Sequence, residues 1–138
     1  MGYLKAELSL KSPYHISKHR QYELMHFCLQ YPEWKAEYHD IYEAVGSIQR
    51  SEVAIVHEKG RPVEDLSERL MELRSAMEMV EKAADYTDRE LREYIILAAT
   101  KDVKYPALST RYGVPCGKDL WYSTYRKFFW ILSQMKGL

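Results

Sequence analysis

The spacing of apolar residues between Val63 and Ala84 constrains the fold of this chain more than any other feature. Successive members are alternately three and four residues apart, which keeps them on one face of an α-helix over three heptads. The flanking positions are charged at Arg69 and Arg74 but not at Ser67. This face could form a homodimer seam at 63–84, or it could pack against other helices of the same chain. The flanking residues favour packing within the chain. The seam consists of Val63, Leu66, Leu70, Leu73, Met77, Val80 and Ala84.

The remaining segments also have helical patterns. Ser17 can cap a helix over residues 18–30. A second apolar face begins after Pro32, and Gly46-Ser47 is expected to end that helix. That face consists of Trp34, Tyr38, Ile41, Tyr42 and Val45. A further helix is predicted over residues 88–101, with Thr87 or Asp88 as its cap.

These patterns predict an all-α fold, a helical bundle that carries a C-terminal helix-turn-helix (sigma-like) subdomain. The predicted organisation has an N-terminal helical pair over residues 1–45 and a linker or loop over 46–62. Residues 63–138 form the helical core, with the helix-turn-helix at about 105–135.

The helix-turn-helix prediction rests on the segment from Ala107 to Leu132. Leu108 fits a short first helix, and Gly113-Val114-Pro115 fits a turn, because glycine adopts a positive φ at little cost. Val114 can fill the space between the two helices. The second helix, 118–135, has Trp121, Tyr125, Phe128 and Leu132 on its inner face. Phe129 and Trp130 then fall on or near the outer surface, where N-terminal helices or a second subunit are expected to cover them.

The outward positions of this segment predict contacts to duplex DNA. Lys118, Tyr122 and Ser123 lie in the half of the second helix that would enter a major groove, so we expect them at base edges. Arg126 and Lys127 are expected to hold phosphates. The predicted DNA-binding residues are Lys118, Tyr122, Ser123, Arg126, Lys127 and Arg111.

Charge is unevenly distributed along a chain whose formal net charge is zero. Residues 101–138 contain seven basic and two acidic residues, whereas residues 33–93 contain nine basic and sixteen acidic ones. This asymmetry is typical of a basic DNA-contacting end attached to an acidic body.

The sequence gives little support to other chemistry. His15 and His19 have helical metal-ligand spacing but no third ligand at a matching position, so no metal or other cofactor is expected. No phosphate loop or nucleophile elbow occurs, and a non-enzymatic role is predicted.

Cys28 and Cys116 are expected to be free thiols, and Cys116 lies near a helix N-terminus that would stabilise its thiolate. The chain lacks a long apolar run or a signal-peptide core, so a cytoplasmic, membrane-free location is expected.

The segment from Gly46 to Leu132 resembles the phage-encoded late transcription regulators of the ArpU and RinA type. The resemblance is carried by Gly60-Arg61-Pro62-Val63-Glu64 before a long helix, by Gly113-Val114-Pro115, and by the run from Trp121 to Lys127. It implies a prophage protein of a bacterial host that binds duplex DNA and controls late genes. It also implies that Tyr122, Arg126 and Lys127 contact DNA. The connection before Leu120 is two residues longer than in that family.

Two alternative functions are a protein that binds other proteins and a DNA recogniser similar to a small terminase. Twelve tyrosines are spread along the chain, and tyrosine is common at protein interfaces. A phage adaptor or host-defence inhibitor could therefore bind RNA polymerase or another protein through an aromatic surface. A recogniser similar to a small terminase would read DNA but would form a ring.

Overall fold

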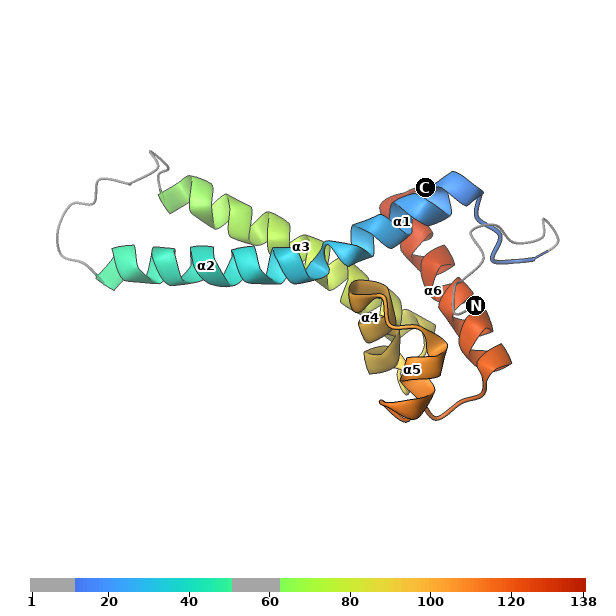
Figure 1. Cartoon of the computed structure of the whole chain (residues 1–138). Coiled ribbons are helices and arrows are strands. Elements are labelled where there is room, and N and C mark those ends of the chain that lie inside the picture. Colours follow the sequence, from blue (N-terminus) through green and yellow to red (C-terminus); the bar gives the residue numbers. More distant parts are fainter. Residues whose placement is uncertain (1–11, 51–62) are drawn as a thin grey trace. The chain divides into compact units, whose positions relative to one another are not determined.

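A computed structural model describes residues 12–50 and 63–138, which form helices joined by short connections. The described residues contain no strand, so the predicted all-α class is confirmed. No helix among them is both long and apolar enough to cross a membrane. The helices are α1 (Lys18–Leu29), α2 (Tyr31–Arg50), α3 (Val63–Thr87), α4 (Arg92–Lys101), α5 (Tyr105–Thr110) and α6 (Lys118–Lys136) (Figure 1).

The chain divides into two compact units. Among the described residues, 12–30 and 79–138 form one, called here the main unit, and 31–50 with 63–78 form the other, called the hairpin unit. Helix α3 is continuous and contributes residues to both units. The segment predicted as an N-terminal helical pair is thus divided, with α1 in the main unit and α2 in the hairpin unit. Most of the predicted linker at 46–62 lies outside the described residues.

The core of the main unit is built on α6. Trp121, Phe128 and Leu132 are almost completely buried, as their spacing of four, seven and eleven residues predicts for one helical face. Tyr125 lies among them, with ring centroids 5.3 Å from Trp121 and 6.2 Å from Phe128. Burial of these large rings supplies most of the apolar area that holds α6 in place.

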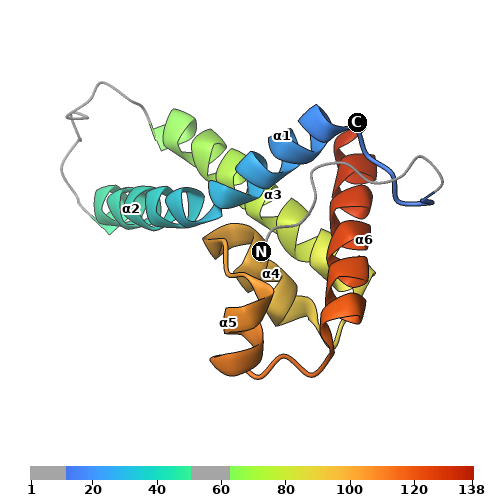
Figure 2. The same cartoon turned by 45° about the vertical axis from the view of Figure 1, so that its right-hand side comes forward.

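Helix α1 and the residues before it pack against α6 (Figure 2). Phe129 is 1% exposed, so its predicted position at the outer surface is wrong; its ring lies 4.9 Å from Tyr125 and 5.0 Å from Phe128. The Tyr14 ring lies 5.5 Å from the Trp130 ring, and Lys136 Nζ lies 3.7 Å from the centre of the Phe27 ring. The inner face of α6 is therefore wider than the single stripe read from the sequence.

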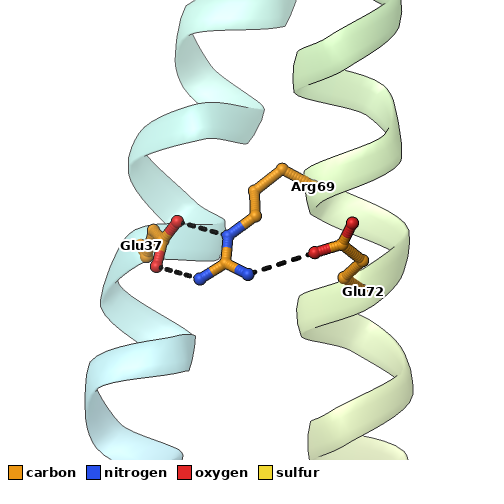
Figure 3. A network of polar contacts seen from close by, with 3 residues as sticks. All are labelled: Glu37, Arg69 and Glu72. Carbon is orange, nitrogen blue, oxygen red and sulfur yellow. Dashed lines mark hydrogen bonds and ion pairs between the residues drawn. The ribbon is translucent and has the colours of Figure 1, made fainter.

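In the hairpin unit, α2 runs antiparallel to the first part of α3, and an ion pair joins them (Figures 1 and 3). Arg69 Nε and Nη2 donate to the two carboxylate oxygens of Glu37 at 2.7 and 2.9 Å. Arg69 Nη1 also donates to Glu72 at 3.2 Å. The hydrogen bond to Glu37 is the main cause that raises the pKa of Arg69 above its usual value.

Leu73 is 1% exposed and Val80 and Ala84 are fully buried, so these seam residues pack within the chain.

Two helix boundaries differ from the prediction. Helix α2 continues through Gly46-Ser47 to Arg50, because packing of the buried Val45 offsets the cost of about 1 kcal/mol for a glycine inside a helix. Helix α4 begins at Arg92 instead of residue 88. Asp88 closes the turn that follows α3: its N–H donates to the Ala84 carbonyl, and its Oδ1 accepts from the Leu91 N–H at 3.0 Å.

The two cysteines are free thiols, as predicted, and their surroundings predict very different reactivity. Cys28 is fully buried, and burial raises the pKa of its thiol to about 12, whereas Cys116 is partly exposed. Because the thiolate is the reactive form, a thiol reagent should label Cys116 in the native protein and Cys28 only after unfolding. Peptide mass spectrometry after timed labelling checks this order, and labelling of Cys28 at the rate of Cys116 would contradict the packing of α1.

Candidate nucleic-acid interface

Helices α5 and α6 are joined by a seven-residue connection, residues 111–117. Leu108 of α5 is fully buried, and Val114 of the connection is 8% exposed. The Val114 N–H donates to the Leu108 carbonyl at 3.0 Å. Val114 is therefore buried and bonded to α5, and this contact fixes the direction in which the connection leaves α5.

Two further features set the path of the connection. Gly113 has a φ of +65°, the left-handed conformation that the sequence predicted for the turn. The Tyr105 hydroxyl, at the start of α5, donates to the Cys116 carbonyl at 3.0 Å. The connection is thus held at Val114 and again just before Gly117, whose carbonyl accepts the Trp121 N–H at 3.0 Å.

The exposed part of α6 presents three of the predicted DNA-binding residues. Lys118 and Ser123 are exposed, and Lys127 is partly exposed. Arg111, which caps the C-terminal end of α5, is also exposed. In α6, Ser123 and Lys127 are four residues apart and follow the same stripe.

The other two predicted residues, Tyr122 and Arg126, form a neighbouring stripe that is half-buried. The Tyr122 ring lies 6.3 Å from the Tyr105 ring of α5. Burial raises the pKa of Tyr122, and the nearby positive charges of Lys104 and Arg126 lower it in part. The Tyr122 hydroxyl and Arg126 Nε are both buried and have no hydrogen-bond partner among the described residues.

Sequence reasoning did not select Lys104 as a site residue. Lys104 lies at the N-terminal end of α5 and pairs with Asp102 at 3.2 Å. Its proximity to Tyr122 depends on the turn between α4 and α5, where Asp102 has a left-handed φ of 53°. A non-glycine residue in that conformation has no reliable sequence signal, although aspartate adopts it more readily than most residues.

Some cations of the chain are paired with carboxylates, whereas the cations selected on α6 and on the connection before it are not; the exposed Lys82 and Arg89 also lack such partners among the described residues. Arg69 and Arg92 each contact carboxylates, Arg92 through Asp85 at 2.6 Å and through Glu93. Arg111, Lys118 and Arg126 have no carboxylate partner among the described residues, and the same holds for Lys127. Their charge is therefore not neutralised by ion pairs within that part of the chain.

The predicted stabilisation of the Cys116 thiolate is wrong. Burial raises the pKa of Cys116, and the negative charge of Asp88 raises it further. Cys116 is therefore a residue of the connection whose carbonyl accepts the Tyr105 hydroxyl. Residues 12–50 and 63–138 also contain no group of three His, Cys, Asp or Glu side chains that could hold a metal ion.

Comparison with models of known protein families, with curated proteins and with solved structures finds no match to this chain. The resemblance to ArpU- and RinA-type regulators therefore stays a prediction from the sequence.

The two glycines of the connection provide a matched test of its geometry. Open space surrounds the Cβ position of each, but Gly113 has a φ of +65° and Gly117 a φ of −78°. We expect Gly113→Ser to lower the free energy of unfolding by about 1 kcal/mol, because a side chain is strained at that φ. Gly117→Ser should leave it unchanged or raise it, since serine can cap α6. Urea unfolding measures the free energy of unfolding of both variants, and equal losses in the two would contradict the described φ of Gly113.

Proposed function

We propose that this chain is a duplex-DNA-binding protein, a transcriptional regulator in which α5, the connection and α6 act as a helix-turn-helix. The supporting observation is the group of cations on this segment, Arg111, Lys118, Arg126 and Lys127, that lack carboxylate partners among the described residues. Such cations bind phosphates and release condensed counterions when they do so. The sequence resemblance adds control of phage late genes as the expected biological role.

The length of α6 indicates which part would enter DNA. Its nineteen residues span about 28 Å, more than twice the width of a major groove of about 12 Å. In the proposed complex the first half enters the groove, with Lys118, Tyr122 and Ser123 near base edges. Arg126, Lys127 and Arg111 hold the flanking phosphates.

The unpaired buried donors of Tyr122 and Arg126 support a ligand at this stripe. A buried donor without a partner costs about 1–3 kcal/mol, and such groups are rare in folded proteins. A small rotation of either side chain toward bound DNA would give the donor a phosphate oxygen or a base acceptor. We propose that DNA binding supplies the partners that these donors lack.

The aromatic residues of α6 offer less support to a protein-binding adaptor. Phe129 is buried, and Trp130 packs on Tyr14, so neither ring is free to present a broad surface. The exposed tyrosines are spread over α1, α2, α3 and the connection before α6; they are Tyr22, Tyr42, Tyr86 and Tyr112. A binding protein that recognises DNA is therefore preferred to an adaptor and to an enzyme.

Neutralising two cations of α6 tests the proposed function. We expect Arg126→Ala/Lys127→Ala to weaken duplex binding and to reduce the slope of log affinity against log salt by about 2, one for each lost phosphate contact. Fluorescence anisotropy at several salt concentrations measures this, with duplex from the region upstream of the protein's own gene and with duplexes selected from a random library.

The control for that experiment is Lys82→Ala/Arg89→Ala, which removes two exposed cations of the same unit outside α6. It should leave the salt slope within error of the wild type. Affinity no tighter than non-specific binding, roughly 10⁻⁴ to 10⁻⁶ M, on every selected duplex would contradict a sequence-specific regulator. Equal losses of DNA affinity in both double variants would contradict the assignment of α6 as the DNA-binding helix.

Removal of the Tyr122 hydroxyl separates a role in binding from a role in folding. Tyr122→Phe should leave the free energy of unfolding unchanged or raise it by up to about 3 kcal/mol, because it removes a buried donor that has no partner in the free protein. Affinity for selected DNA should fall about fivefold to tenfold, since the complex loses a hydrogen bond. Unchanged DNA affinity of a folded Tyr122→Phe variant would show that the hydroxyl does not contact DNA.

A further inference from the structure

The exposed side of the first two turns of α6 is chemically mixed and not uniformly basic. Asp119, Leu120 and Ser123 are all exposed, whereas Trp121 and Thr124 of the same turns are buried. Because residues three and four apart are neighbours on a helix, Ser123 lies next to both Asp119 and Leu120. These three exposed side chains are called here the mixed face.

Leu120 is an unusual side chain on this surface. It is 58% exposed, more than any other leucine that the structure describes. In duplex DNA the apolar group that faces the major groove is the methyl group of thymine, and apolar side chains contact it there. On a helix that enters the groove, an exposed leucine is therefore a suitable partner for that methyl group.

Asp119 restricts how the mixed face can be placed on DNA. It forms no ion pair with another described residue. A carboxylate is repelled by phosphates, whereas at a base edge it accepts a hydrogen bond from the amino group of cytosine. The favourable place for Asp119 is thus the floor of the major groove, and its neighbours Ser123 and Leu120 face the same floor.

Cations border the mixed face along the helix. Lys118 precedes it and Lys127 follows it, nine residues or about 14 Å further along the helix axis. Lys118 is exposed and Lys127 is partly exposed. Phosphates line the edges of a groove and the bases form its floor. An acidic and apolar centre between cations matches this distribution of charge, which a surface that binds only phosphates does not require.

We propose that Leu120 and Asp119 select the DNA sequence that α6 binds. Leu120 contacts the methyl group of a thymine, and Asp119 accepts a hydrogen bond from the amino group of a cytosine. This inference rests on the proposed function and adds the bases of the binding site to it. The cations position the helix on any duplex, whereas these two residues favour duplexes that present thymine and cytosine to α6.

Replacing thymine by deoxyuridine in a duplex selected from a random library tests the Leu120 contact, because uracil lacks only the methyl group. At one thymine, the replacement should weaken binding of the wild-type full chain about fourfold, since burial of one methyl group is lost. Leu120→Ala should bind the two duplexes equally. Leu29→Ala is the matched control, because Leu29 is a 38% exposed leucine of α1, and it should keep the fourfold difference.

Each thymine is replaced in turn, and fluorescence anisotropy measures the affinities. A selected duplex in which no replacement weakens binding, or a fourfold effect that persists in Leu120→Ala, would overturn the Leu120 contact and leave DNA binding intact. Failure to select any duplex bound more tightly than random DNA would contradict the proposed function and this inference with it.

Asp119→Asn tests the cytosine contact. At one position of the selected site, the wild type should prefer cytosine over the other bases about tenfold. Asp119→Asn should reduce that preference to about twofold, because the charged acceptor is lost. An aspartate that acts only on the dipole of α6 would lower the thermal stability when replaced and leave the base preference unchanged, and this result would overturn the cytosine contact.

Discussion

The packing of the aromatic face of α6 is the interaction on which the main unit depends. Trp121, Phe128 and Phe129 are buried together, and Tyr125 contacts all three rings. Burial raises the pKa of the Tyr125 hydroxyl well above its usual range. Because α1 covers the same helix, the rotation of α6 about its axis is fixed. That rotation decides which of its residues remain outside and can meet a ligand.

The exposed side of α6 and the connection before it follow from this packing. Once Trp121 is buried, Ser123 and Lys127 must lie on the opposite side, and Tyr122 and Arg126 lie at the boundary. Val114 and the Tyr105 hydroxyl then hold the connection against α5. The resulting cluster of cations that lack ion-pair partners supports the proposal of a DNA-reading helix.

Much of the fold could be predicted because the spacing of apolar residues directly indicates helices. The intervals of the seam predicted α3, and the Gly113-Val114 pair predicted the turn before α6. The inner position of Phe129 was missed, since the width of the buried face of α6 depends on long-range packing that local spacing does not encode. Likewise, Gly46 gave a local stop signal that packing of Val45 overrides. The Arg69–Glu37 pair was also missed, because sequence spacing alone does not orient two helices relative to each other.

The most direct test of DNA recognition by α6 is a nuclear magnetic resonance titration of the labelled full chain with its selected duplex. The proposed function predicts that backbone amide shifts change most in residues 105–127, and that the Arg126 Nε–H signal moves as it gains an acceptor. Residues 31–50 of the hairpin unit should change little. Large changes confined to α2, or no change in α6 at saturating duplex, would contradict the central claim.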